Sequence, residues 1–366
     1  MSRLSPTARA AAAAGAALLW CVAGGSFANA PGPNRALVLT PQKSGTLSNL
    51  IGVSPVNDRV VWASGRGGAF ALTTDGGAHW RSGVVAGAEA LQFRDVEAFS
   101  ADVAYLLAIG NGPDSRIYKT SDGGKSWAQQ FIGHDSKAFY NCFSFWSESR
   151  GIAFSDSVDG HFPGLRTTDG KTWVEIGQRL PAARATEGGF SSSGTCVATH
   201  GARHGWIATG ASAPRARVLV TEDGGDHWTA HETPLRGAAT AGAFSVAFRD
   251  PLHGLVGGGE LGPAQADLDN VARSSDGGKT WKLTARAPIG TIFGLAYARP
   301  RAAAPVAHAI VVATGPGGAA WSADEGDTWT QLPGVAHYWS VAFADERNGW
   351  LVGTEGRILK IEVTGP

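Results

Sequence analysis

The chain has 366 residues, of which 17% are charged, and its 31 basic side chains balance its 31 acidic ones. This balance excludes the broad basic surface of a nucleic-acid-binding protein, because such a surface needs an excess of Lys and Arg. The 51 glycines and 13 tryptophans favour many short strands that are joined by tight turns and packed through aromatic side chains.

Residues 1–30 have the features of a secretory signal peptide. Their only charges are two arginines, residues 10–23 are almost wholly apolar, and Ala-Asn-Ala ending at Ala30 resembles a cleavage site. The apolar run is too short to span a membrane. We therefore expect cleavage after Ala30 and a mature domain of residues 31–366 that is periplasmic or secreted, with a retained N-terminal anchor as the alternative. No later segment predicts a membrane span.

An isolated strand is predicted at Ala36–Thr40, and after it a strand–turn–strand motif occurs six times. One copy is Thr120-Ser-Asp-Gly-Gly-Lys-Ser-Trp127. Asp122 can accept hydrogen bonds from backbone amides of its own turn, and the two glycines supply the positive φ angles of a reversal. Trp127 then returns a large apolar surface to a core. The six copies carry these pairs: Asp75 and Trp80, Asp122 and Trp127, Asp169 and Trp173, Asp223 and Trp228, Asp276 and Trp281, Asp324 and Trp329.

The repeat has the length of one four-stranded propeller blade. Its tryptophans are 46 to 55 residues apart, and repeats of this size with four short strands are typical of β-propellers. In the second copy we predict strands at Val96–Phe99, Ala104–Ile109, Arg116–Thr120 and Ser126–Phe131. After Trp329 three more strands follow without a turn motif. We therefore predict an all-β, seven-bladed propeller of antiparallel blades, the last one closed by the N-terminal strand, because closure removes exposed sheet edges.

The six turns resemble the Asp-box, or BNR, repeat of sialidases and sortilin-type receptors. Together with second strands that begin Gly-Trp, as at Gly205 and Gly349, they look more similar to the photosystem II stability and assembly factor family and its bacterial relatives labelled oxidoreductases. The resemblance covers residues 36–363. It implies a seven-bladed propeller that acts as a scaffold for assembly or binding.

The six turn aspartates and their tryptophans are interpreted as structural, because catalysis needs one or two placed carboxylates and not six equivalent ones. No phosphate-binding loop or dinucleotide fingerprint is present, so we expect no cofactor. The histidines are scattered, and His200 and His204, although spaced like helical ligands, flank a predicted strand-to-strand turn, so we predict no metal. A cation held by Asp267 and Asp269 is left open.

In propellers the longer loops, between second and third strands and between blades, share the face opposite the turn motifs. We name these two sides the loop face and the turn face. Binding groups tend to lie on loops that a rigid scaffold positions, so we place the site on the loop face. The candidate residues there are Lys137, Tyr140, Asp156, Asp159, His161, Glu187, Glu260, Asp267 and Asp269.

These residues favour a binding scaffold for a protein partner, and we expect a monomer. The alternative is a glycan-binding glycoside hydrolase of sialidase-like or glucan type, which would need two carboxyl groups facing one cleft. Asp156 with Glu187, or Asp159 with Asp267, could supply such a pair. The Arg-Ile-Pro signature of sialidases is absent. Whether the protein has any enzymatic activity is left open, with a non-enzymatic role favoured.

Cys142 and Cys196 occupy one register on the first strands of successive repeats. Blades related by rotation point equivalent side chains in the same rotational sense, whereas a disulfide needs converging Cβ vectors. We therefore predict that these two cysteines do not form a disulfide.

Overall fold

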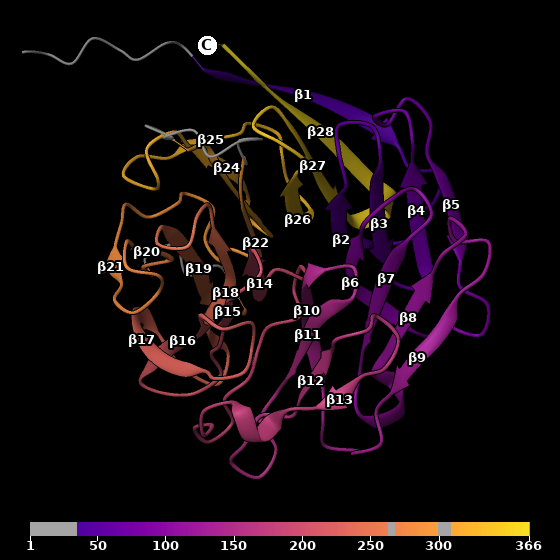
Figure 1. The fold of residues 1–366 in the computed structure, drawn as a ribbon. Helices are drawn as coiled ribbons and strands as arrows, with labels where there is room; N and C mark the ends of the chain where they lie inside the picture. The colour runs from indigo at the N-terminus through magenta and orange to yellow at the C-terminus, as the bar shows by residue number, and fades with distance from the viewer. Residues whose placement is uncertain (1–34, 263–267, 299–308, 366) are drawn as a thin grey trace, which may run out of the picture. The chain divides into compact units, whose positions relative to one another are not determined.

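A computed structural model describes residues 35–262, 268–298 and 309–365. Its strands form seven four-stranded sheets with antiparallel neighbours. The sheets follow one another around a central axis (Figure 1), so the predicted seven-bladed β-propeller is confirmed. No helix within the described ranges is long and apolar enough to cross a membrane. The predicted signal peptide and Asp267 lie outside the described residues.

In each blade consecutive strands pair side by side, and the first strand contacts the first strand of the next blade around the centre. Blade 1 consists of β2 (Leu50–Pro55), β3 (Val61–Gly65), β4 (Ala69–Thr73) and β5 (Arg81–Val84). Blade 2 consists of β6 (Gln92–Ala98), β7 (Ala104–Ile109), η1 (Gly112–Asp114), β8 (Arg116–Thr120) and β9 (Ala128–Ile132). Blade 3 consists of β10 (Tyr140–Ser147), β11 (Arg150–Ser155), β12 (Gly164–Thr167) and β13 (Val174–Glu175), followed by η2 (Gly177–Arg179).

The remaining blades repeat this order. Blade 4 consists of β14 (Val197–His200), β15 (His204–Ala208), β16 (Arg215–Thr221) and β17 (Thr229–Arg236). Blade 5 consists of β18 (Ala241–Phe248), β19 (Gly254–Glu260), β20 (Val271–Ser274) and β21 (Lys282–Leu283). Blade 6 consists of β22 (Gly294–Tyr297), β23 (Val311–Gly315), β24 (Gly318–Ser322) and β25 (Thr330–Gln331). Blade 7 consists of β26 (Tyr338–Phe343), β27 (Asn348–Gly353), η3 (Thr354–Gly356), β28 (Arg357–Thr364) and β1 (Ala36–Lys43).

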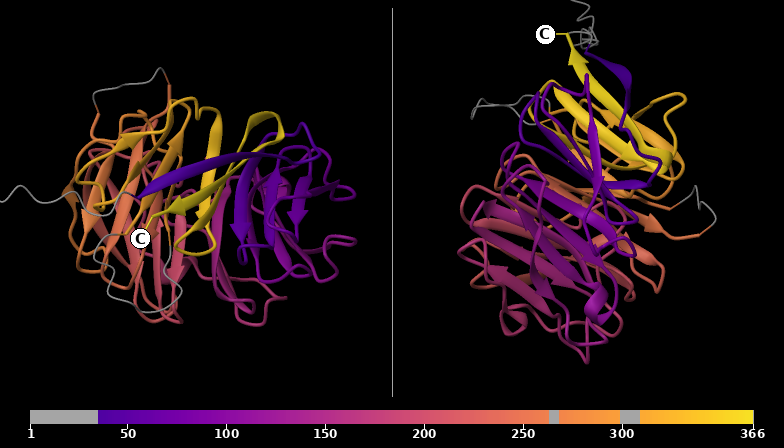
Figure 2. Two further views of the ribbon diagram at one scale, coloured as in Figure 1. Left: turned by 90° about the horizontal axis from the view of Figure 1, so that it is seen from above. Right: turned by 90° about the vertical axis from the view of Figure 1, so that its right-hand side faces the viewer.

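The N-terminal strand closes the ring. β1 pairs antiparallel with β28, from Ala36 opposite Thr364 to Lys43 opposite Arg357, and Figure 2 shows the two strands side by side. The predicted pairing is therefore confirmed, although β1 runs to Lys43 and not only to Thr40. Because β1 covers the outer edge of β28, that edge is not left with unpaired backbone groups.

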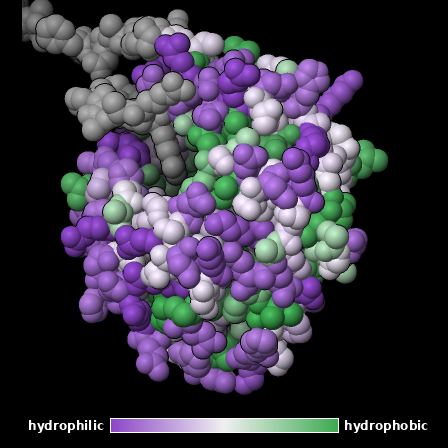
Figure 3. All heavy atoms as spheres, turned by 45° about the vertical axis from the view of Figure 1, so that its right-hand side comes forward, coloured by the Kyte–Doolittle hydropathy of each residue, from purple (hydrophilic) through white to green (hydrophobic). Residues whose placement is uncertain are grey.

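Each interface between neighbouring blades has its own apolar core. The turn tryptophan of one blade packs against the blade before it, as Trp127 does edge-on against Trp62 at 6.0 Å between ring centroids. Trp62, Trp206 and Trp350 of the second strands are fully buried. On the flank drawn in Figure 3, apolar residues form small separate groups among hydrophilic ones. The stability of the ring therefore comes from contacts between blades as well as from strand pairing.

The six turn aspartates all accept hydrogen bonds within their own turns. In the second copy, Asp122 Oδ1 accepts hydrogen bonds from the Thr120 hydroxyl and from the amide of Ser126, both at 2.9 Å. The hydrogen bonds from Ser126 lower the pKa of Asp122 to about 2. The corresponding bonds are made by Asp75, Asp169, Asp223, Asp276 and Asp324.

Candidate binding face

The first strands of five blades have a β-bulge near their start, at the loop face. The register shifts by one residue between Phe93 and Asp95 in blade 2, and equivalent shifts occur in four other blades. A bulge leaves one residue unpaired and re-aims its side chain. The five bulged residues are Ile51, Arg94, Asn141, Phe244 and Trp339.

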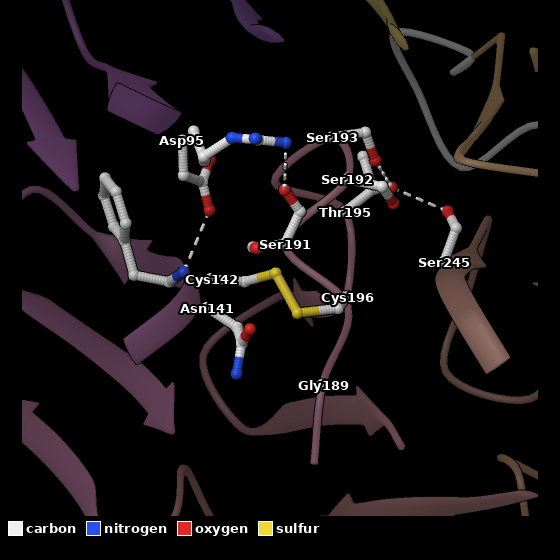
Figure 4. The surroundings of a disulfide bond; sticks show 12 residues. Asp95, Asn141, Cys142, Gly189, Ser191, Ser192, Ser193, Thr195, Cys196 and Ser245 are labelled. Atoms are coloured by element: carbon white, nitrogen blue, oxygen red, sulfur yellow. Dashed lines mark hydrogen bonds between the residues drawn. A yellow bond between two sulfur atoms is a disulfide. The ribbon is translucent and has the colours of Figure 1, made fainter. Parts of the chain in front are cut away.

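A segment from the connection between blades 3 and 4 fills the centre of the ring. We call residues 188–196 the channel plug. Its serines and threonines contact four blades: Arg94 Nη1 of blade 2 donates to Ser191 O at 3.1 Å, and the Ser340 hydroxyl of blade 7 donates to Ser193 O at 3.0 Å. Thr195 bonds Ser245 of blade 5 at 2.7 Å (Figure 4), and the Ser193 hydroxyl donates to the carbonyl of Phe293 before blade 6. The plug therefore closes the channel at the level of the bulges.

A disulfide joins Cys142 and Cys196, with 5.9 Å between their Cα atoms (Figure 4). The prediction that these cysteines stay unpaired is wrong. It assumed two strand residues related by rotation, but β14 begins only at Val197, so Cys196 belongs to the plug. Cys142 in turn follows directly on the bulge of β10. Neither side chain therefore keeps the direction that regular blades would impose, and the bond fastens the plug to blade 3.

Beside the plug an arc of aromatic rings ends at an arginine. Phe190 stacks on Phe244 with centroids 3.8 Å apart, and Phe293 lies 5.3 Å from Trp339. The guanidinium carbon of Arg94 lies 5.5 Å from the Trp339 ring centroid, a cation–π contact. Phe190, Arg94 and Trp339 are partly exposed. We call Arg94, Phe190, Phe293 and Trp339 the mouth cluster.

The guanidinium group of Arg94 is largely removed from solvent. Burial, and secondarily the charge of Arg66, lower its pKa to about 10, which still leaves the guanidinium protonated at neutral pH. Its Nη2 donates to Gln92 Oε1 at 3.2 Å, and its buried Nε has no hydrogen-bond partner. Within the described chain Arg94 forms no ion pair with a carboxylate. A carboxylate of a bound molecule would balance this charge.

Three predicted residues lie on the exposed part of the loop face next to blade 3. Lys137 Nζ is 2.9 Å from Asp159 Oδ2, and these side chains are 63% and 70% exposed. An ion pair so exposed contributes little to stability. His161 is exposed in the same turn as Asp159, where residues 158 and 161 form a bridge. The side chains of Lys137, Asp159 and His161 are therefore accessible to a partner.

Asp156 is partly buried, Glu187 is buried, and both already have partners. Asp156 Oδ1 accepts hydrogen bonds from Asn141 Nδ2 at 2.8 Å and from the Gly189 amide at 3.0 Å, and burial raises its pKa to about 6. The Glu187 side chain is 2% exposed and accepts two hydrogen bonds from Arg217 and one from Thr209. Both carboxylates are thus committed to holding the connection that leads into the plug.

The other predicted residues lie apart from this group. Glu260 ends β19 in blade 5, and its Oε2 accepts a hydrogen bond from Arg236 Nη1 at 2.9 Å. Asp269 is exposed, and Asp267 lies outside the described residues. Throughout the described chain, no three His, Cys, Asp or Glu side chains are arranged to hold a metal ion.

Tyr140 and His161 are brought together in one pocket of about 600 Å³ between blades 2 and 3. Tyr140 is buried, and its ring meets Phe131 of β9 edge-on at 5.2 Å. A second cavity of about 330 Å³ lies in the channel, with Ser193, Gly194 and Thr195 of the plug at one end and first-strand residues such as Phe248 along its walls. The plug separates this cavity from the loop face.

Sequence reasoning missed the mouth cluster. When the first strands of the repeats are aligned, Phe244, Phe293 and Trp339 stand one residue before the small residues Ser245, Gly294 and Ser340. This shared position, which Arg94 occupies in blade 2, was the signal that the sequence offered. Without knowledge of the bulges, it did not predict that these side chains gather at the mouth of the channel.

Comparison with known proteins finds no matching family model. The chain is 27% identical to the photosystem II assembly lipoprotein Ycf48 of Nostoc sp. strain PCC 7120 over 189 residues, which are 51% of this chain and 46% of that protein. The chain thus spans about half the length of the curated relative it matches.

Among solved structures, one described as YCF48 bound to D1 peptide superposes with a TM-score of 0.63 at 17% identity, over 89% of this chain and 97% of that one. YCF48 from Cyanidioschyzon merolae gives 0.56 at 18% identity over 88% and 98%. A streptogramin B lyase gives 0.59 at 10% identity over 90% and 98%. Identities this low establish a common fold, and the fold alone does not determine function.

Proposed function

We propose that this protein is a non-enzymatic scaffold that binds a protein partner on its loop face, centred on the mouth cluster. The observation that carries the proposal is Arg94, a desolvated guanidinium on the ring of Trp339 without a carboxylate partner in the described chain. Arg and Trp at the centre of a surface are the residue types that dominate binding energy. The partner would present a carboxylate, from an acidic side chain or a chain end, to Arg94.

The relatives are consistent with this function. The curated relative is named an assembly lipoprotein, and one solved relative is described as bound to a peptide. A peptide that binds to the loop face of this protein could not pass into the channel, because the plug fills it. We infer that the partner lies across the mouth and does not thread through the ring. We also infer that the six turns are Asp-box repeats with a structural role and that the protein is a monomer.

Glycoside hydrolysis is not favoured by the geometry. It requires two carboxyl groups on either side of one cleft, one of them free to give up a proton. Asp156 and Glu187, the pair that the sequence offered, are instead bonded to Asn141, Gly189 and Arg217. The pairing of Asp159 with Asp267 falls partly outside the described residues.

We further propose that the chain is exported and loses residues 1–30. The disulfide between Cys142 and Cys196 supports export, since such bonds persist mainly in oxidising compartments. N-terminal sequencing of the protein from the periplasm or medium should begin at Pro31. A first residue of Met1 would overturn this proposal.

Site-specific photocrosslinking in the native cell tests the docking face. A photoreactive residue in place of Trp339 should form a discrete adduct with a protein partner. The same residue in place of His79, which is exposed on the turn face, is the matched control and should form none. An adduct from position 79 together with silence at position 339 would refute docking on the loop face.

A further inference from the structure

The pocket between blades 2 and 3 is a second site on the loop face, separate from the mouth cluster. It encloses about 600 Å³, within the range of cavities that hold small organic ligands. One wall is apolar and comes from Phe131 of β9, Ala138 before β10 and Ile176 after β13. None of the mouth-cluster residues lines it. A ligand of this pocket would therefore be selected by the residues of the pocket itself.

The charged groups at this pocket leave it negative. Asp135 and Glu175 are exposed at its lining, and neither forms an ion pair within the described chain. The arginine in the lining is Arg179, whose Nη1 lies 2.5 Å from Asp226 Oδ1, an oxygen that Arg166 also contacts at 2.6 Å. Lys137, two residues from Asp135, is paired with Asp159. The lining thus holds two carboxylates without an ion-pair partner against one arginine, so its formal charge remains negative.

Tyr140 adds a buried polar group to the same pocket. The residue is 2% exposed, and its hydroxyl forms no hydrogen bond with any described residue. Burial raises the pKa of this hydroxyl, and the charges of Glu175 and then Asp135 raise it further. Both carboxylates therefore act on the phenol, which stays protonated and can both donate and accept. This hydroxyl lies at the pocket lining and has no partner there among the described residues, so it is available to a bound group.

We propose that this pocket binds a lysine or arginine side chain of a bound polypeptide. The aliphatic stem would lie along Phe131 and Ile176, and the cationic head would meet Asp135 and Glu175 with the Tyr140 oxygen as a further acceptor. The rings of Phe131 and Tyr140, 5.2 Å apart, offer aromatic surface that favours a cation over a neutral group. This inference does not depend on docking at the mouth cluster.

Blocked amino acids test the site directly, without knowledge of a natural partner. Ligand-observed NMR titration of the mature protein should show binding of N-acetyl-lysine methylamide and its arginine counterpart, with N-acetyl-norleucine methylamide at least tenfold weaker. Raising the ionic strength should weaken the cationic ligands, because exposed carboxylates are screened by salt. Equal affinity for lysine and norleucine would overturn the proposal. Tighter binding of the free diamine cadaverine than of blocked lysine would overturn a polypeptide source.

Conservative variants locate the binding. Asp135→Asn keeps the carbonyl that accepts the Lys137 amide, so it and Glu175→Gln should fold normally and each weaken the lysine ligand about 3- to 10-fold. Tyr140→Phe should weaken it about threefold with the fold unchanged by circular dichroism. Glu346→Gln, an exposed carboxylate on the turn face, is the control. Full affinity in the Asp135 and Glu175 variants would refute this site, whereas Arg94→Gln should bind the probes normally even if docking at the mouth fails.

Discussion

At the scale of single residues, the candidate carboxylates separate by burial into structural and accessible groups. Asp135 and Glu175 are exposed, whereas Asp156 is partly buried and accepts hydrogen bonds from Asn141 and Gly189. A buried carboxylate that accepts hydrogen bonds from amides can anchor a loop, but its ionised form is disfavoured by desolvation. The pKa of Asp156 is accordingly raised from 3.8 to about 6. This shift makes a structural role for Asp156 measurable through the pH dependence of stability.

Asp156→Asn should reduce the loss of stability on going from pH 5 to pH 7.5. The folded protein binds a proton at Asp156 more readily than the unfolded chain, so protonation favours folding and the free energy of unfolding falls as pH rises through about 6. The whole effect is at most about 3 kcal/mol, of which about 1.4 kcal/mol falls between pH 5 and pH 7.5 because the rest is already lost below pH 5. Urea unfolding of both proteins at the two pH values measures it. Asp159→Asn controls for loss of a surface charge, and an unchanged pH dependence in Asp156→Asn would contradict this role.

The contacts of a single side chain also account for the positive φ angle of Glu325. Glu325 stands where the other turns have glycine, and its φ is 57°. The left-handed conformation is costly for a residue with a Cβ. Its carboxylate pairs with Arg249 of the neighbouring blade. The ion pair between blades therefore gives Glu325 a contact that glycine could not make and that offsets part of this cost.

At the scale of elements, β1 holds the ring closed through one side chain as well as through its backbone. Gln42 Oε1 accepts hydrogen bonds from the indole nitrogens of Trp80 and Trp350, at 3.0 and 3.2 Å. Its Nε2 donates to Gly76 O at 3.0 Å. A single amide thus connects the last blade with the turn of the first.

Gln42→Ala should lower the free energy of unfolding by about 2–4 kcal/mol. The change removes three hydrogen bonds and leaves the buried Trp350 indole without an acceptor, and an unsatisfied buried donor costs about 1–3 kcal/mol. Denaturant unfolding measures the change, with Gln331→Ala on the exposed outer strand β25 as the control. A loss below about 1 kcal/mol, equal to that of the control, would show that β1 closes the ring by backbone pairing alone.

The strands also show which features of the fold the sequence could predict and which it could not. Repetition predicted the seven blades and the closure, and β7 and β8 span the predicted residues. Strand ends that depend on packing differ from the prediction. β6 begins at Gln92 and not at Val96, because its bulged start belongs to the channel wall. The plug has no counterpart in other repeats, so periodicity could not predict it. The disulfide was missed for the same reason, because rotational equivalence does not extend to Cys196.

At the scale of the whole molecule, the two faces are built differently. Turns on one face are closed by their own aspartates, whereas the opposite face combines a closed channel, the mouth cluster and a negatively charged pocket. These two sites differ in charge: Arg94 suits a carboxylate, and Asp135 with Glu175 suits a cation. A polypeptide that contacts both would be held in one direction across the loop face, because complementary charges fix orientation.

The most direct test is the affinity of the partner identified by crosslinking for the protein altered at Arg94. We predict that Arg94→Gln weakens binding at least tenfold and that Arg94→Lys, which keeps the charge but not the planar fork, gives an intermediate loss. Arg59→Gln, an exposed arginine on the turn face, should change the affinity less than twofold. Unchanged affinity in a folded Arg94→Gln variant, or a loss confined to Arg59→Gln, would contradict docking at the mouth cluster.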